Sequence, residues 1–287
     1  MSNGPDTKLG TIITAMVTPF AGDGSVDFES TRVLLNHLVE NGSDGVVVAG
    51  TTGEAPTLTD DEQIELIRFV VQEFGDRLTV IAGAGANDTA HAVRLTERST
   101  EVGAAAILSS TPYYNRPNEA GLRLHYEAVA KSTHLPIVLY NVPTRTGLDM
   151  SDRLASELGA AHSNIVGMKQ ARPGDPSAIE GLDLYAGNDD SFAAALDAGG
   201  VGGILVASHL LGKEMRAVAE SSNRAEADAP YRVFYDALGV TTNPIPIKAA
   251  LDLAGLPGGP LRLPLVEASS EERAVIETAM REVGLLT

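Results

Sequence analysis

One lysine stands at the end of a short apolar run, Ile165-Val166-Gly167-Met168-Lys169. A continuous apolar run of this length is typical of a buried β-strand, so the amine of Lys169 is expected at the border of a core. Burial lowers the pKa of an ammonium group and leaves free amine, which a Schiff-base nucleophile requires. The alternative is an ordinary lysine at a strand end, whose amine reaches solvent or a carboxylate. The motif alone leaves both interpretations open.

A second candidate is the turn Gly50-Thr51-Thr52-Gly53, which is followed by Glu54. Two glycines around two threonines suit a tight turn that exposes backbone N–H groups and two hydroxyls. Such a turn could hold a small carboxylate, although a purely structural turn would have the same residues.

Two further side chains could act on the same substrate. Tyr140 ends the apolar run that precedes the run of Lys169, and its hydroxyl could pass protons to and from a carbinolamine. The alternative is a core tyrosine bonded to a carbonyl. Arg145 lies just beyond, and its planar guanidinium suits a carboxylate, although a surface ion pair is the simpler interpretation. Taken with Lys169 and the threonine turn, these residues predict a keto-acid substrate.

The elements that must position these residues are apolar runs of strand length. Most are continuous rather than alternating, as expected of parallel strands covered on both faces. The expected strands are residues 11–17, 45–49, 78–82, 104–108, 136–140, 165–169, 182–186 and 202–207.

Amphipathic helical patterns separate these runs, at about thirty residues per unit. The expected helices are residues 27–40, 60–74, 89–102, 119–132, 151–158 and 191–198, followed by 210–221, 224–239, 247–254 and 270–283. About eight β/α units predict an α/β fold of the (β/α)8 TIM-barrel type with a C-terminal helical appendix. We expect a barrel over residues 1–222 and a helical region over residues 223–287. A doubly wound sheet is the alternative, but no Gly-x-Gly-x-x-Gly turn follows the first strand.

In such barrels the chemistry lies at the C-terminal ends of the strands. The stretches expected there are Gly50–Glu54, Thr111–Pro117, Tyr140–Gly147, Lys169 and Gly187-Asn188-Asp189. We therefore expect all of them to meet at one mouth.

Composition narrows the function classes. The 287 residues are 44% hydrophobic and carry a net charge of −17, which disfavours nucleic acid and anionic membranes as partners. No apolar run reaches spanning length, and the polar N-terminus lacks the pattern of a signal peptide, so a cytoplasmic protein is expected. Cysteine is absent and the 6 histidines are scattered, which disfavours thiolate chemistry and a zinc site.

Two other catalytic arrangements have weaker support in the sequence. No Gly-x-Ser-x-Gly elbow is present for a serine nucleophile. The glycines at 199–203 could form a phosphate-binding turn or simply allow close packing of backbone beside a substrate.

Several stretches, from Thr14-Ala15-Met16-Val17-Thr18-Pro19-Phe20 to Asn243-Pro244-Ile245-Pro246-Ile247-Lys248, occur in the order of a known family. The chain resembles the class I pyruvate-dependent lyases and synthases, and within them the dihydrodipicolinate synthase family. The resemblance implies condensation of pyruvate with aspartate semialdehyde in the lysine and diaminopimelate pathway, with a pyruvate imine on Lys169 and no separate cofactor.

The resemblance also implies roles for the other site residues. Tyr140 and Thr52 would form a proton relay with Tyr114, which in this family reaches in from the neighbouring subunit of a homotetramer. Thr51 and Thr52 would hold the pyruvate carboxylate, and Arg145 would bind the second substrate. Gly187 and Ile204 match positions that line the pocket through their backbone.

The sequence departs from the family pattern near two functions. Gln170 stands where an acidic residue is common. Members inhibited by lysine carry histidine and glutamate at positions that are Asp60, Gln63 and His91 here, whereas Asn87 and Tyr113 match. Lysine inhibition is therefore expected to be weak or absent.

Two alternatives to the synthase are considered. N-acetylneuraminate lyases and keto-deoxy sugar-acid aldolases share the lysine, the tyrosine and the turn, but they usually have Ser-Thr in the turn and no counterpart of Arg145. A catalytically silent barrel with a binding role would have no reason to keep all of these side chains.

Overall fold

Eight parallel strands form a closed barrel in the computed structural model, which describes residues 9–287. The polar N-terminal stretch at residues 1–8, which lacks a signal-peptide pattern, lies outside the described residues. The strands are β1 Ile12–Ala15, β2 Gly45–Val48, β3 Thr79–Gly83, β4 Ala106–Ser110, β5 Ile137–Asn141, β6 Ile165–Gln170, β7 Asp183–Ala186 and β8 Gly202–Leu205. Each strand pairs with the next in the chain, and β1 pairs with β8, which closes the sheet. The predicted barrel is confirmed, and an open doubly wound sheet is excluded.

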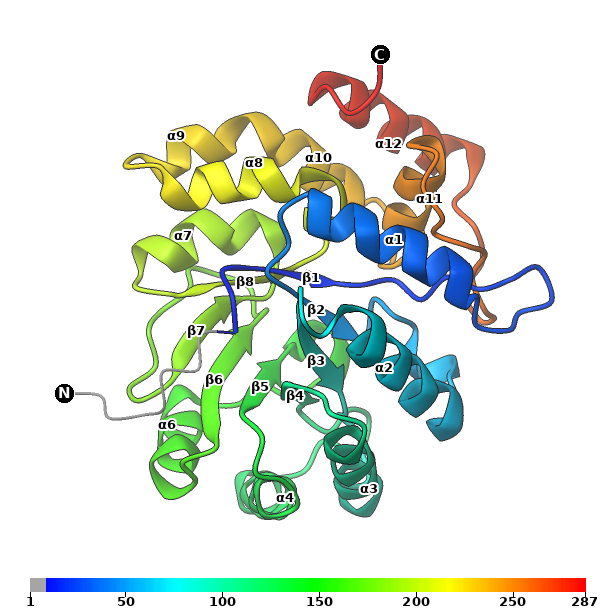
Figure 1. Cartoon of the computed structure of the whole chain (residues 1–287). Coiled ribbons are helices and arrows are strands. Elements are labelled where there is room, and N and C mark those ends of the chain that lie inside the picture. Colours follow the sequence, from blue (N-terminus) through cyan, green and yellow to red (C-terminus); the bar gives the residue numbers. More distant parts are fainter. Residues whose placement is uncertain (1–8) are drawn as a thin grey trace.

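Helices surround the strands on the outside of the barrel (Figure 1). The helices of the barrel units are α1 Phe28–Glu40, α2 Asp60–Phe74, α3 Thr89–Glu101, α4 Glu119–Lys131, α5 Pro143–Thr146, α6 Asp152–Ala161, α7 Phe192–Asp197 and α8 Ser208–Glu220. Two short 3-10 helices, η1 Ala55–Thr57 and η2 Asp189–Ser191, follow β2 and β7.

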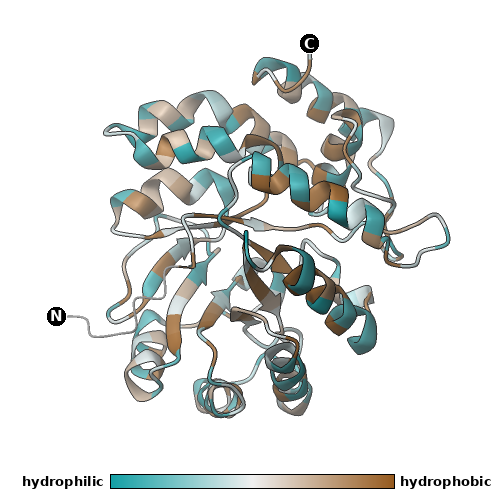
Figure 2. Ribbon diagram, in the orientation of Figure 1, coloured by the Kyte–Doolittle hydropathy of each residue, from teal (hydrophilic) through white to brown (hydrophobic). Residues whose placement is uncertain are grey.

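Local sequence explains where several of these helices begin. Thr59 and Glu62 form a capping box at the start of α2, because each side chain bonds the backbone of the other. The side chains of Asp27 and Asp88 accept N–H groups from the first turns of α1 and α3. The helices then turn their apolar faces toward the strands, so that brown stripes face inward and teal outward in Figure 2.

Two apolar clusters make up the core. The larger lies between the strands and the helices. The smaller fills the barrel interior, and its members include Tyr140, Tyr185, Ala171 and Ile204. Inward-facing residues of this kind make the barrel a packed core rather than a pore. Lys169 and the site around it therefore lie on top of a packed barrel interior.

Four helices follow the barrel. They are α9 Arg224–Asp228, α10 Arg232–Leu238, α11 Ile245–Leu253 and α12 Ser270–Glu282, with the 3-10 turn η3 Ala229–Tyr231 between α9 and α10. The single helix expected over residues 224–239 was wrong. Pro230 lies in η3 and lacks an N–H group for a continuous α-helix, so the segment breaks there. Helix α12 packs on α10 and α11, and α11 also contacts α8.

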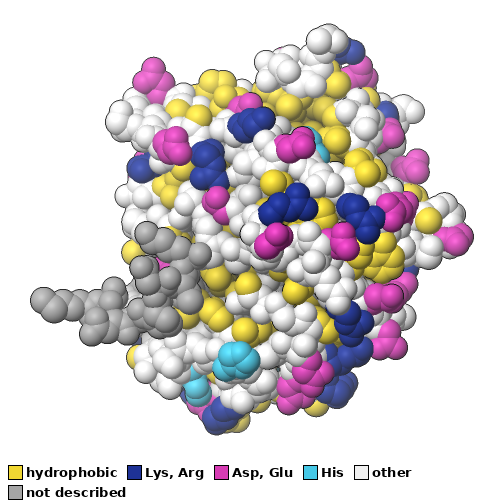
Figure 3. All heavy atoms as spheres, viewed as in Figure 1, with side chains coloured by type: hydrophobic (Ala, Val, Ile, Leu, Met, Phe, Trp, Pro, Cys, Tyr) yellow, Lys and Arg dark blue, Asp and Glu magenta, His cyan; other side chains and the backbone are white. Residues whose placement is uncertain are grey.

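The face of the molecule shown in Figure 3 carries acidic and basic side chains side by side. Neither positive nor negative side chains gather into a large patch on this face.

Within residues 9–287, no helix has both the length and the apolar character that crossing a membrane requires.

Candidate functional site

Lys169 and Tyr140 lie directly opposite each other on neighbouring strands. The register of β5 and β6 pairs these two residues, and the next strand places Tyr185 beside Lys169. The Nζ atom of Lys169 lies 4.3 Å from the centre of the Tyr140 ring. Lys169 is only 5% exposed, so the half-exposed lysine of the simpler interpretation is excluded.

Burial changes the ionisation of both side chains. It lowers the pKa of Lys169 to about 7, a shift that Asp189 opposes and the positive charge of Arg145 favours. A substantial fraction of this lysine is therefore free amine near neutral pH. Burial raises the pKa of Tyr140, so its hydroxyl keeps its proton and can donate it.

The threonine turn follows β2 and lies at the same mouth. Burial raises the pKa of Tyr140, and a hydrogen bond with the Thr51 side chain opposes that shift. The hydroxyl of Thr52 instead accepts a hydrogen bond from the Asn243 side chain at 2.9 Å. The place of Thr52 in a relay with Tyr140 stays a prediction. Ala49 just before the turn has a φ of 55°, and such a left-handed step changes the direction of the residues after it.

Arg145 lies on the short helix α5, which directly follows β5. Its guanidinium donates to the main-chain carbonyl of Asn243 at 3.1 Å, and the side chain is otherwise exposed. Its charge acts on Lys169 and Tyr140, lowering the pKa of both. Arg145 is therefore held at the entrance, with donors left for an anionic ligand.

Gly187 and Ile204 lie at the ends of β7 and β8. A Cβ atom at Gly187 would come within 2.7 Å of both the Ala171 Cβ and the Gln170 carbonyl oxygen, so only glycine fits there. Ile204 is fully buried in the barrel interior with Tyr140.

Two residues of this site had no role assigned from the sequence. Asp189 begins η2 just past β7, and its carboxylate accepts the N–H groups of Val206 and Ala207 at 2.9 and 3.0 Å. Burial raises the pKa of Asp189 to about 6, although these N–H groups and Lys169 oppose the shift. Its place after the seventh strand was the only signal in the sequence. Asn243, which bonds both Thr52 and Arg145, gave no such signal, because it is distant along the chain from both.

Tyr114 is not part of this cluster within one subunit. It lies in the loop between β4 and α4, its side chain is 91% exposed and its φ is 69°. Non-glycine residues seldom adopt this conformation, which is commonest at functional or tightly constrained positions.

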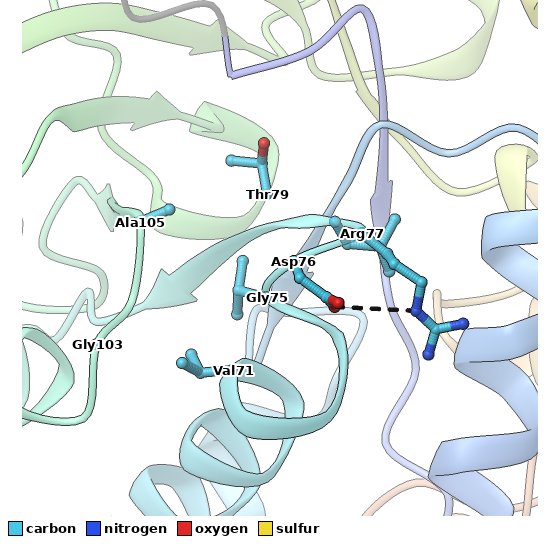
Figure 4. A pocket seen from close by; sticks show the side chains of 9 residues that line it. Val71, Gly75, Asp76, Arg77, Thr79, Gly103 and Ala105 are labelled. Atoms are coloured by element: carbon cyan, nitrogen blue, oxygen red, sulfur yellow. Dashed lines mark ion pairs between the residues drawn. The ribbon is translucent and has the colours of Figure 1, made fainter.

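Other kinds of site are not found at this mouth. Among residues 9–287 no three His, Asp or Glu side chains gather as metal ligands would. A pocket lined by the end of α2 and the starts of β3 and β4 contains an Asp76–Arg77 pair at 4.0 Å (Figure 4). It lies at the N-terminal ends of the strands, opposite to Lys169, where barrel residues serve stability rather than chemistry.

Comparisons with known proteins agree with this geometry. Residues 8–283 match the Dihydrodipicolinate synthetase family. A 4-hydroxy-tetrahydrodipicolinate synthase of Moorella thermoacetica is 43% identical, over 97% of this chain and 100% of the relative.

Two solved structures are similar over nearly the whole chain. A synthase from Cyanidioschyzon merolae with lysine bound is 38% identical with a TM-score of 0.92, covering 97% of this chain and 99% of that one. A chloride-inhibited synthase of Acinetobacter baumannii complexed with pyruvate is 35% identical with a TM-score of 0.93, covering 97% and 100%. The chain belongs to the dihydrodipicolinate synthetase family.

Proposed function

We propose that this protein is a 4-hydroxy-tetrahydrodipicolinate synthase, which condenses pyruvate with aspartate semialdehyde through an imine on Lys169. The observation that carries the proposal is a buried lysine with a pKa of about 7, held opposite Tyr140 at the mouth of a barrel. Relatives named as this synthase are similar to the chain over nearly their whole length. As a biosynthetic enzyme of this family, it would act in the cytoplasm.

The reaction begins when the neutral amine of Lys169 attacks the ketone of pyruvate. Tyr140 donates a proton to the carbinolamine hydroxyl, which leaves as water and gives the imine. Loss of a proton from the substrate methyl group then forms an enamine. The enamine carbon attacks the aldehyde of the second substrate, whose own amine then attacks the imine carbon, closes the ring of the product and displaces the amine of Lys169. The covalent imine supplies the electron sink, so no separate cofactor is part of the proposal.

We propose different roles for the two threonines of the turn. We assign Thr51 to the proton relay because it bonds Tyr140, and both threonines to the pyruvate carboxylate. The third relay member is Tyr114 of the partner subunit. Its exposed side chain and left-handed backbone suit a residue that completes a neighbouring site. The protein would then be a homo-oligomer, and a tetramer built from such dimers is the arrangement that we propose.

Arg145 is assigned to the carboxylate of aspartate semialdehyde, while the backbone at Gly187 and Ile204 lines the pocket. A guanidinium at the entrance favours the synthase over the sugar-acid aldolases, whose substrates extend as hydroxylated chains. For the whole chain, we propose a catalytic barrel over residues 1–222 and a helical region over residues 223–287. The end of α8 at Glu220 and the start of α9 at Arg224 support this division.

The test is to trap the imine and measure condensation in the same preparations. Pyruvate with borohydride should add the mass of a reduced pyruvate adduct at Lys169, and Lys169→Met should show none. Arg145→Ala should keep the adduct but lose about 100-fold in kcat/KM for aspartate semialdehyde, because a charge-assisted contact is lost. A parent enzyme that turns over without an adduct would contradict the imine. Equal turnover by Arg145→Ala would favour an aldolase.

A further inference from the structure

A buried ion pair joins the threonine turn to the C-terminal helices. The Nζ atom of Lys248, on α11, lies 2.7 Å from the carboxylate of Glu54, and the two side chains are 3% and 1% exposed. Glu54 directly follows the Gly50–Gly53 turn. Neither residue has a role in the chemistry proposed above.

Each member of the pair has further partners, so its position is closely fixed. The amine of Lys248 donates to the carbonyls of Thr18 and Pro260 at 2.8 and 2.7 Å. It also lies 4.6 Å from the centre of the Phe20 ring. The other carboxylate oxygen of Glu54 accepts the backbone N–H of Arg262 at 3.0 Å. Both charges are thus paired in a buried region, so removing either member would leave the other without its counter-charge.

The turn itself has a strained backbone that contacts from outside the turn must stabilise. Glu54 has a φ of 57° and Ala49, at the other end of the turn, has a φ of 55°. Non-glycine residues in this region are strained, and they persist only where the surroundings enforce them. Between them, the Glu54 N–H bonds the Thr51 carbonyl at 3.1 Å. A change in the backbone at Glu54 would therefore move Thr51.

A second contact fixes the same turn. The hydroxyl of Thr18 donates to the carbonyl of Gly53 at 2.6 Å, and the carbonyl of the same threonine accepts from Lys248. The amine of Lys248 thus reaches the turn by two routes, through Glu54 and through Thr18.

We propose that the Glu54–Lys248 pair positions the carboxylate-binding turn, so that Lys248 of the C-terminal region is required for tight pyruvate binding although it does not touch the substrate. The proposal rests on the proposed function, because it takes Thr51 and Thr52 as the pyruvate site. Glu54 and Lys248 are positioning residues rather than catalytic ones.

Stability and positioning can be separated by comparing single and double variants. Glu54→Gln or Lys248→Met alone leaves one buried charge without its partner, which destabilises strongly. The double variant removes both charges, so its thermal stability should lie nearer to the parent. The double variant still lacks the ion pair that fixes the turn, and even a small displacement of binding groups weakens substrate binding.

The measurement is the KM for pyruvate beside the melting temperature. The KM does not depend on the fraction of enzyme that is folded, so the single variants remain informative even where folding is incomplete. We expect the KM for pyruvate to rise about tenfold or more in the single and the double variants, with a smaller change in kcat. The KM for aspartate semialdehyde at saturating pyruvate should change less, because Arg145 lies outside the turn.

Arg273→Met is the matched control, because Arg273 pairs at 2.6 Å with Asp252 of the same helix α11 but at an exposed position. Its KM for pyruvate should equal that of the parent. A double variant with restored stability and a KM within about twofold of the parent would overturn the positioning role. That result leaves the imine of the parent at Lys169 intact, whereas absence of the imine in the parent would refute the proposed function itself.

Discussion

At the scale of single residues, the charges around Lys169 set the pH at which its amine becomes a nucleophile. Burial is the main reason that its pKa falls to about 7, Asp189 raises it and Arg145 lowers it further. Imine formation needs the neutral amine, so kcat/KM for pyruvate should rise with pH through about 7.

Asp189→Asn tests this balance. Asparagine keeps an oxygen for the N–H groups of Val206 and Ala207 but removes the negative charge that stabilises the ammonium form of Lys169. The rise in kcat/KM for pyruvate should therefore move to lower pH. Asp197→Asn removes the same charge from an exposed pair with Arg224 and should leave the profile in place. A shift to higher pH in Asp189→Asn would show that Asp189 does not act on Lys169 by its charge.

The residues show which parts of the site a sequence can predict. Lys169 and Tyr140 end continuous apolar strands, and parallel strands bring their ends together, so their meeting followed from pattern alone. The left-handed backbone of Ala49 before the threonine turn was not predicted, because no periodicity signals this conformation in a residue other than glycine.

At the scale of elements, the eight strands were predicted to within about two residues, because buried parallel strands read as unbroken apolar runs. Helix ends were less clear, and the break at Pro230 between α9 and α10 was missed. The apolar spacing of residues 224–239 fits one helix, while the missing N–H group of a single proline decides otherwise.

Helices α2 and α3 carry the residues expected to affect lysine control. Asp60 and His91 form a pair at 2.8 Å across these helices. The side chain of Gln63 donates to the Gly83 carbonyl, so one of its two amide N–H groups is already used. An incoming lysine would find no free carboxylate for its amine at His91, and Asp60 would repel its carboxylate. The relative from Cyanidioschyzon merolae has lysine bound, so lysine binding by this chain can be compared with that of a relative that binds it.

We expect half-maximal inhibition by lysine only above about a millimolar, measured on initial rates at saturating pyruvate. The double variant Asp60→His and His91→Glu reverses the pair and places the residues of the lysine-inhibited pattern at both positions. Calorimetry should show tighter lysine binding to this variant than to the parent. Inhibition of the parent well below a millimolar, with matching heat, would mean that other residues form a lysine site.

At the scale of the whole molecule, we propose that Tyr114 of a neighbouring subunit completes the site. Tyr114 is 91% exposed, and no other tyrosine among the described residues has comparable exposure. If it completes the site of a neighbour, two inactive variants should restore each other. In a mixture of Tyr114→Phe and Lys169→Met, one site of each mixed dimer has both an intact lysine and an intact tyrosine.

Random exchange of subunits between equal amounts of the two variants makes half of the dimers mixed. Each mixed dimer has one working site out of two, so activity should recover to about a quarter of the parent value. Subunits would be exchanged by refolding the two variants together, and each variant refolded alone gives the baseline. The control mixture is Arg145→Ala with Lys169→Met. Arg145 influences Lys169 within the same subunit, so every site in that mixture lacks one of the two and no recovery is expected. Recovery in neither mixture would place Tyr114 outside the partner's site, whereas recovery in the first alone requires that the active unit contain at least two chains.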